Sequence, residues 1–206
     1  MIKRLIDIVA SFVGLAVITP LCVVIAIAIK IDSRGPVFFS QERIGRGFRP
    51  FRILKFRSMT SLSPRQGALQ ITVSGDKRVT RVGRFLRRSK LDELPQLVNV
   101  LRGEMSLVGP RPEVHKYVEM FRRDYETILR CRPGITDLAS ITYRDEERIL
   151  AAAADPEREY VEHVLPEKIA LAKQYVRDAS LRLDANLLAR TLLRIVRHER
   201  GENDKR

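Results

Sequence analysis

The sequence is poor in the residues that bind zinc, form disulfides or stack on nucleic-acid bases. It contains no tryptophan, two cysteines and three histidines, and 6% of its residues are aromatic. Because Cys22 lies in an apolar run and Cys131 follows a basic segment, we expect no disulfide and a reducing compartment. So few histidines and cysteines also argue against a zinc site. No internal repeat or low-complexity stretch occurs.

Acidic residues are too few to balance the basic ones. The 206 residues include 38 Lys and Arg against 25 Asp and Glu, which gives a formal net charge of +13. Such a charge suggests an anionic partner, either nucleic acid, an anionic membrane surface or a phosphorylated substrate. With 45% hydrophobic and 31% charged residues, the chain is neither disordered nor polytopic, and its length allows one sizeable core.

One long stretch near the N-terminus contains no charged residue. It runs over residues 8–29 and, at about 1.5 Å per residue in a helix, is long enough to cross a hydrocarbon core of about 30 Å. Hydropathy alone favours a single spanning anchor. It is long for the core of a signal peptide.

Other features of this stretch favour a re-entrant membrane helix. Pro20 near its middle predicts a bend, and the hydroxyl of Thr19 can satisfy part of the freed backbone. Both flanks are basic, and basic flanks prefer the cytoplasmic side. Two arms that meet at Pro20 would each reach about half-way across the core and return to the same face.

The remaining sequence predicts an α+β fold with a small β-hairpin and several amphipathic helices. Strands are expected over 37–44 and 51–57, joined at Gly45-Arg46-Gly47, with a polar loop over 61–76. The spacing of leucine and other apolar residues predicts helices over 81–102, 114–130, 146–154 and 166–198. We also expect a turn over 132–136 and a frayed, charged tail over 201–206. These helices either pack on an ordinary core or lie on the membrane with Lys and Arg at the headgroups.

The adjacent carboxylates Asp92 and Glu93 follow a basic run of Arg84, Arg87, Arg88 and Lys90. Chemistry on a phosphate needs an anionic nucleophile or metal ligand together with cations that hold the phosphates. We expect the pair near a helix N-terminus, capped by Ser89 or with Pro95 in its own first turn. The alternative is a solvated pair that is salt-bridged to Arg88 or Lys90.

Eight short motifs behind the apolar segment occur in one order. Together they make the chain resemble the bacterial sugar transferases, which are monotopic phosphoglycosyl transferases, over roughly the first two-thirds of its length. The motifs are Gly35-Pro-Val-Phe-Phe39, Gln41-Glu-Arg-Ile-Gly45, Lys55-Phe-Arg-Ser-Met59, Asp76-Lys-Arg-Val-Thr80, Gly83-Arg-Phe-Leu-Arg87, Leu91-Asp-Glu-Leu-Pro-Gln-Leu97, Asn99-Val-Leu101 and Met105-Ser-Leu-Val-Gly-Pro-Arg-Pro112.

The resemblance implies transfer of a phosphosugar from a UDP-sugar to polyprenyl (undecaprenyl) phosphate, with UMP as the leaving group. It implies that Asp92 is the covalent nucleophile, that Glu93 is the ligand of Mg²⁺, and that the apolar segment is re-entrant. It places the enzyme on the cytoplasmic face of a bacterial inner membrane. There it would begin assembly of a lipid-linked glycan for a capsule, exopolysaccharide, O-antigen (lipopolysaccharide) or glycoprotein.

Several cations are candidates for binding the substrate phosphates. Arg111 stands between two prolines, so its planar fork is presented with little loss of entropy; the alternative is a structural turn with a solvated arginine. Weaker candidates, which could equally be surface cations or bind lipid phosphate, are Lys55, Arg57, Arg78 and Arg87.

We therefore expect a membrane helix over 1–34, a catalytic domain over 35–200 and a flexible tail over 201–206. The expected partners are membrane lipid, polyprenyl phosphate and a UDP-sugar, with a homodimer left open and nucleic acid excluded by the missing motif and few aromatics. Without the extra N-terminal spans of larger members, the chain resembles a minimal catalytic form. A non-catalytic membrane scaffold is the alternative function. Because residues 137–146 depart from the family pattern, the sugar stays open.

Overall fold

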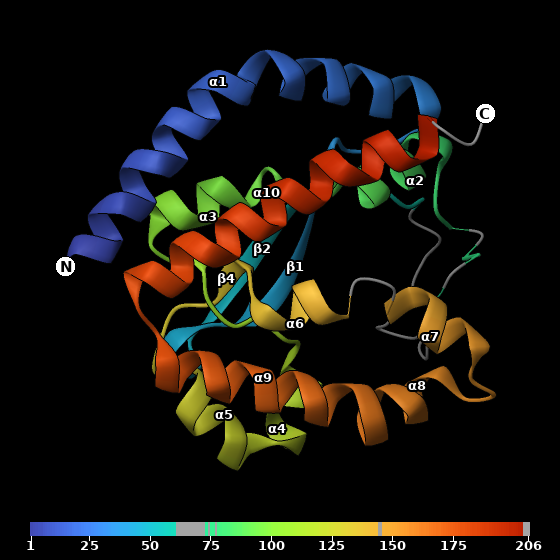
Figure 1. Ribbon diagram of the computed structural model, residues 1–206. Helices are drawn as coiled ribbons and strands as arrows, with labels where there is room; N and C mark the ends of the chain where they lie inside the picture. Colours follow the sequence, from blue (N-terminus) through green and yellow to red (C-terminus); the bar gives the residue numbers. More distant parts are fainter. Residues whose placement is uncertain (61–72, 74, 77, 144–145, 204–206) are drawn as a thin grey trace.

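The long helix α1 (Ile2–Asp32) begins the chain and arches over the other elements in Figure 1. The computed structural model describes residues 1–60, 73, 75–76, 78–143 and 146–203, so most of the predicted 61–76 loop lies outside the described residues. Helix α1 is long and apolar enough to cross a membrane. Most of its apolar side chains are exposed, among them Phe12 and Val17, which leaves them available to lipid.

Pro20 lies inside α1 without interrupting it. The helix continues from one side of the proline to the other, and the hydroxyl of Thr19 donates to the carbonyl of Leu15 at 2.6 Å. The predicted pair of arms is therefore one continuous, arched helix, because a single proline removes one backbone hydrogen bond while its neighbours keep theirs.

The predicted hairpin is present. Strands β1 (Phe38–Ile44) and β2 (Pro50–Phe56) pair antiparallel, with Phe38 opposite Phe56, and the helical turn η1 (Arg46–Phe48) joins them. Alternation along β2 buries Phe51 and Ile53 against helix α3 (Gln96–Arg102) and strand β3 (Ser106–Val108). Lys55 lies on the same face of the strand, two residues further along.

The predicted helix over 81–102 is three elements instead of one. Helix α2 (Arg81–Ser89) ends where Lys90 adopts a left-handed conformation with φ of 59°, and the short 3₁₀ turn η2 (Leu91–Glu93) precedes α3. Ser89 closes α2, since its hydroxyl donates to the carbonyl of Phe85 at 2.8 Å, so the expected cap at this residue is wrong. Pro95 instead lies at the N-cap position of α3, directly before its first residue.

The segment 132–136, predicted as a turn, forms strand β4 (Gly134–Thr136), which pairs parallel with β3. The backbone segments around Gly134 and Gly109 come so close that a Cβ on Gly134 would lie 2.1 Å from the amide nitrogen of Gly109. Glycine is therefore required at this crossing, and the crossing fixes the turn that follows β3.

The predicted helix over 146–154 is present as one helix, α7 (Glu146–Ala152), whereas two other predicted helices are subdivided because single residues leave the helical conformation. The 114–130 helix divides at Phe121, where ψ is 36°, and the 166–198 helix divides at Ala179, where ψ is 122°. The expected frayed tail is helical as far as Asn203. The elements are α4 (His115–Met120), α5 (Arg122–Ile128), α6 (Leu138–Thr142), α7 (Glu146–Ala152), α8 (Pro156–Glu159), η3 (Tyr160–Val164), α9 (Leu165–Asp178) and α10 (Leu181–Asn203).

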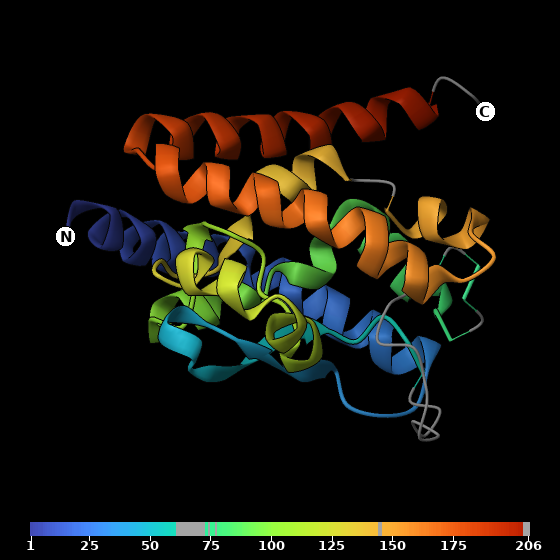
Figure 2. The same ribbon diagram turned by 90° about the horizontal axis from the view of Figure 1, so that it is seen from below.

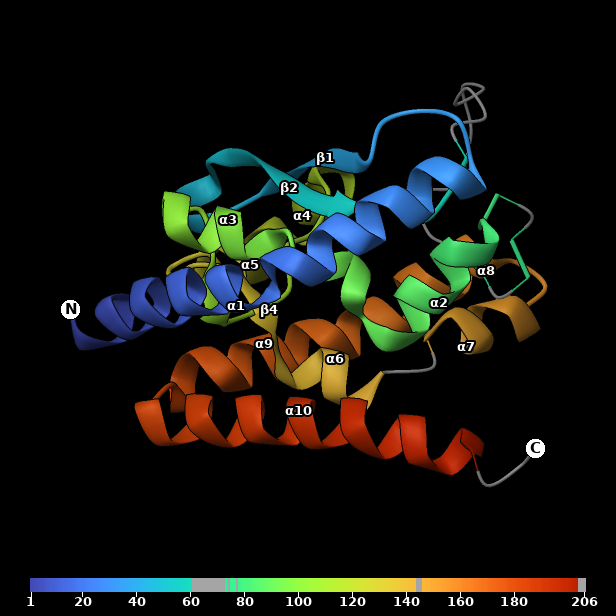
Figure 3. The ribbon, with the colours of Figure 1, turned by 90° about the horizontal axis from the view of Figure 1, so that it is seen from above.

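The β1–β2 hairpin and helix α10 lie on opposite sides of the molecule, as Figure 2 and Figure 3 both show. The largest apolar cluster lies between them, and its members come mainly from α4, α5, α7, η3 and α9. They include Val118, Tyr125, Leu150, Tyr160 and Leu165. The segment over 89–112, which carries the acidic pair, packs against β2 through η2 and α3, and against α1 through α3.

Candidate active site

The acidic pair lies inside the protein. Asp92 and Glu93 form part of η2, and they are 6% and 8% exposed. The left-handed turn at Lys90 redirects the chain after α2. The pair is thus not the solvated surface dipeptide of the alternative interpretation. A buried carboxylate is unfavourable unless cations or hydrogen-bond donors surround it or its pKa is raised.

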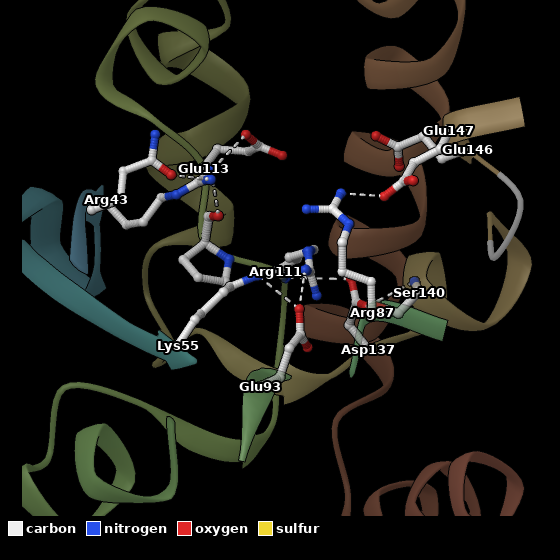
Figure 4. A network of polar contacts seen from close by, with 12 residues as sticks. Arg43, Lys55, Arg87, Glu93, Arg111, Glu113, Asp137, Ser140, Glu146 and Glu147 are labelled. Atoms are coloured by element: carbon white, nitrogen blue, oxygen red, sulfur yellow. Dashed lines mark hydrogen bonds and ion pairs between the residues drawn. The ribbon is translucent and has the colours of Figure 1, made fainter. Parts of the chain in front are cut away.

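Glu93 is held by two cations from distant parts of the chain. Its Oε1 atom accepts from Nζ of Lys55 at 2.8 Å and from Nη2 of Arg111 at 2.6 Å (Figure 4). Burial alone would raise the pKa of Glu93, but the charges of Arg111 and Lys55 outweigh it and hold the pKa well below its usual range. Glu93 is therefore ionised, and its ion pairs connect strand β2, which carries Lys55, to the turn after β3, which carries Arg111.

Asp92 has a different environment from its neighbour. Its Oδ1 atom is buried and has no hydrogen-bond partner within the described part of the chain. Burial, followed by the charge of Glu93, raises the pKa of Asp92 above its ordinary value. The two carboxylates therefore differ in role, because one is neutralised by cations and the other presents an unpaired oxygen.

The turn that carries Arg111 is fixed at several points. The amide of Gly134 donates to the carbonyl of Pro110 at 3.0 Å, and the amide of Arg111 faces Oδ2 of Asp137 at 3.3 Å. The carboxylate of Glu93 raises the pKa of Arg111, so the guanidinium is always charged. Burial lowers the pKa of Lys55.

The other predicted phosphate ligands are placed differently. Arg87 forms an ion pair with Glu147 and points toward it in Figure 4. The positive charge of Arg87 is also close enough to Asp92 to act on its pKa, in the downward direction. Arg78 is engaged by Asp76, with Nη2 to Oδ2 at 2.6 Å. Arg87 therefore borders the site, whereas Arg78 is committed to a local pair.

Arg57 serves the end of helix α1. Its guanidinium is buried and donates to the carbonyl of Ser33 at 2.7 Å and to that of Arg34 at 3.0 Å. The structure thus gives Arg57 the role of capping α1, and its hydrogen bonds are not directed at the Glu93 cluster.

A second buried polar cluster, which the sequence did not reveal, adjoins Arg111. Glu113 accepts from the Tyr160 hydroxyl at 2.8 Å, and it pairs with Arg43 at 3.4 Å and with Lys168 at 3.5 Å. A small cavity next to it is lined by both Arg111 and Glu113 and by residues of α5, α6 and α9. These partners come from separate elements, so no local motif signals them; the one sequence hint is the position of Glu113 directly after the Pro-Arg-Pro turn.

Asp92 and Glu93 are adjacent carboxylates that could contribute to a site for a divalent cation. No group of three or more His, Cys, Asp or Glu side chains with metal-binding geometry occurs in the described residues. Mg²⁺ commonly takes one or two carboxylates and completes its shell with phosphate oxygens and water. The unpaired oxygen of Asp92 beside the Glu93 carboxylate fits that kind of site.

Known proteins match this chain over nearly its whole length. The family model described as bacterial sugar transferase matches residues 1–198. A UDP-N-acetylgalactosamine-undecaprenyl-phosphate N-acetylgalactosaminephosphotransferase of Aeromonas hydrophila is 42% identical over 200 residues, which cover 95% of this chain and 44% of the relative.

Two further relatives carry related names. An undecaprenyl-phosphate glucose phosphotransferase of Komagataeibacter xylinus is 42% identical, over 93% of this chain and 35% of its own. A UDP-glucose:undecaprenyl-phosphate glucose-1-phosphate transferase of Caulobacter vibrioides is 40% identical, over 92% of this chain and 68% of its own. The chain spans less than half the length of the first two of these relatives. The match over nearly all of its residues shows that the chain belongs to the bacterial sugar transferase family.

Proposed function

We propose that the protein transfers a phosphosugar from a UDP-sugar to undecaprenyl phosphate and thereby begins assembly of a lipid-linked glycan. The observation that carries this proposal is the buried Asp92–Glu93 pair, in which Asp92 keeps an unpaired oxygen while Lys55 and Arg111 neutralise Glu93. The names of the relatives, which describe transferases that act on undecaprenyl phosphate with UDP-sugars, support the substrate class.

The reaction proceeds in two displacements at one phosphorus atom. A carboxylate oxygen of Asp92 attacks the phosphorus that carries the sugar, and the bond from that phosphorus to the oxygen of UMP breaks. The phosphosugar is then an acyl phosphate on Asp92. An oxygen of undecaprenyl phosphate attacks the same phosphorus, the bond to Asp92 breaks, and the product is undecaprenyl diphosphosugar.

The cations around Asp92 support this chemistry. Arg111 and Lys55 offer their charges to the diphosphate when it reaches the site, and Glu93 keeps both in place before it arrives. When bound, Mg²⁺ would be held by Glu93 and would neutralise charge on the diphosphate. Burial of the pair excludes bulk water, which would otherwise hydrolyse the acyl phosphate.

The membrane placement follows from the two substrates. One is soluble and the other carries its phosphate at the bilayer surface, so the site should lie at that surface. The exposed apolar face of α1 supports insertion, and the basic residues on both flanks support return to the cytoplasmic face of the inner membrane. The proposal therefore treats α1 as re-entrant.

Release of UMP tests this function. Protein purified in detergent or nanodiscs would receive Mg²⁺ and a panel of UDP-sugars, with and without undecaprenyl phosphate. We expect steady UMP release with the acceptor, and without it a burst of about one UMP per protein as the acyl phosphate accumulates. Asp92→Asn should lower turnover by at least about a thousandfold.

Asp124→Asn is the matched control, since Asp124 lies on α5 in an ion pair with Lys173. It should leave turnover within about twofold of the unsubstituted protein. UMP release that survives Asp92→Asn undiminished would rule out the covalent route.

A further inference from the structure

Asp137 connects the Arg111 turn to helix α6. It follows strand β4 directly and is 3% exposed. Its Oδ1 atom accepts from the amide of Ser140 at 2.8 Å and also from the Ser140 hydroxyl, which caps the N-terminus of α6. Its Oδ2 atom faces the amide of Arg111 at 3.3 Å. One carboxylate therefore serves two segments, one with each oxygen.

The amide of Arg111 has few alternatives to this bond. Proline lacks an N–H group, so Arg111 supplies the one backbone donor of the Pro110–Pro112 stretch. An unpaired backbone donor in a half-buried turn is unfavourable, and Asp137 is the acceptor that the fold provides for it.

Arg111 is consequently held at both ends. Asp137 engages its backbone, and Glu93 engages its guanidinium at 2.6 Å. An incoming diphosphate must compete with Glu93 for the guanidinium. The backbone contact would persist during that exchange and keep the arginine aimed at the diphosphate.

We propose that Asp137 is a positioning residue for the diphosphate of the donor substrate, and that it acts through the backbone of Arg111. The inference rests on the proposed function. Asp137 itself carries a negative charge close to Arg111, so its electrostatic effect on an anionic ligand is repulsive. Asp137 therefore favours binding of the diphosphate by positioning Arg111, whereas its negative charge disfavours the same binding.

Asp137→Asn separates these effects. Asparagine caps a helix as well as aspartate does, so its amide oxygen keeps the bond to Ser140. Its amide nitrogen is a donor, which would face the N–H group of Arg111 and cannot replace the lost acceptor. Asp137→Ser provides the same test if the asparagine variant fails to fold, because serine also caps helices but has one side-chain oxygen.

The measurement is the dissociation constant of UDP, determined by calorimetry with Mg²⁺ on the full chain in detergent, beside KM and kcat for UMP release. We expect Asp137→Asn to weaken UDP binding and raise KM by about tenfold, the effect of losing a hydrogen bond to a charged group. The thermal midpoint should fall by only a few degrees, because one backbone donor loses its acceptor, and kcat should change little. Asp155→Ala is the control for loss of a cap, since Asp155 caps α8 in the same way and is exposed. It should lower the thermal midpoint and leave UDP binding unchanged.

Each other outcome has a definite meaning. If Asp137→Asn binds UDP as well as the unsubstituted protein, or more tightly because a negative charge is gone, Asp137 is only a helix cap and the inference is wrong. Normal UMP release by the unsubstituted protein in the same experiment would leave the proposed function intact. Absence of both UDP binding and UMP release in the unsubstituted protein would overturn the proposed function, and the inference with it.

Discussion

At the scale of single residues, Asn99 shows how one side chain fixes the strand that delivers Lys55. It is fully buried, its Nδ2 atom donates to the carbonyl of Arg52 at 2.8 Å, and its Oδ1 atom accepts from the amide of Leu54 at 2.9 Å. Asn99→Ala would leave both backbone groups of β2 unpaired. We expect a loss of about 2–4 kcal/mol in the free energy of unfolding.

Denaturant unfolding followed by circular dichroism in detergent would measure this loss. Asn186→Ala is the matched control, because Asn186 is an exposed asparagine on helix α10, and it should change stability by less than about 0.5 kcal/mol. Equal stabilities of the two variants would contradict the structural role of Asn99.

The sequence motifs identified the charged residues of the candidate site, but they did not show which of these residues form ion pairs with one another. Asp92, Glu93, Lys55 and Arg111 all lie in motifs that single them out, yet nothing local says that Lys55 and Arg111 meet at one oxygen of Glu93. Arg57 belongs to the same motif as Lys55, but its partners are backbone carbonyls at the end of α1. Backbone acceptors leave no trace in sequence, so side-chain charge alone suggested a phosphate ligand.

At the scale of elements, apolar spacing identified the helical regions but not their interruptions. Leucines at positions 91, 94 and 97 recur every three residues, a spacing that both an α-helix and a 3₁₀ turn satisfy. The break comes from the left-handed conformation of Lys90 and from Pro95, which lies at the N-cap position of α3. The β-hairpin was predicted correctly because alternation and glycines are local signals, whereas the β3–β4 pair joins distant segments.

Helix α1 yields a prediction about membrane topology. If it is re-entrant, both flanks lie on the cytoplasmic side. Single cysteines introduced by Ile2→Cys and Arg34→Cys, with Cys22 and Cys131 replaced by serine, should both react with a membrane-impermeant thiol reagent in inside-out vesicles and not in intact cells. Pro20→Ala should shift part of the population to a spanning orientation, because the bend at this position would be relieved.

Reaction of the two flanks from opposite sides in the protein that keeps Pro20 would show that α1 spans the membrane. The cysteine pair is internally controlled, since both positions are examined in the same vesicles with the same reagent.

At the scale of the whole molecule, polar contacts join the N-terminal helix to the C-terminal ones around the turn that carries Arg111. The carbonyl of Val108 accepts from Lys3 at 3.1 Å and from the Tyr175 hydroxyl at 3.2 Å, and Asp184 binds both donors. Helices α1, α9 and α10 therefore meet at the residue that precedes Gly109-Pro110-Arg111. The position of helix α1 and the position of the turn that carries Arg111 are thus fixed by one set of hydrogen bonds.

The Glu113 cluster links further elements and makes stability depend on pH. Burial raises the pKa of Glu113, but the charges of Lys168 and Arg43 more than offset it, and the Tyr160 hydroxyl and the charge of Arg111 act in the same direction. The folded-state pKa therefore lies below the ordinary value of 4.5. A group with a depressed folded-state pKa stabilises the protein above its unfolded-state pKa, and that stabilisation is lost as the pH falls through the folded-state pKa.

Comparison with Glu113→Gln isolates this contribution from that of the other carboxylates. At pH 7 the variant should be less stable by on the order of 3 kcal/mol, because Lys168 and Arg43 lose a buried partner. Below about pH 4.5 the difference should shrink, since Glu113 takes up a proton first in the unfolded state and then in the folded state, as the pH falls through the lower folded-state pKa. Denaturant unfolding at a series of pH values from 7 to 3 measures both stabilities. Glu126→Gln removes an exposed carboxylate of α5 and should alter stability by less than about 0.5 kcal/mol throughout. A difference between Glu113→Gln and the unsubstituted protein that stays constant down to pH 3 would show that the charge of Glu113 does not hold these elements together.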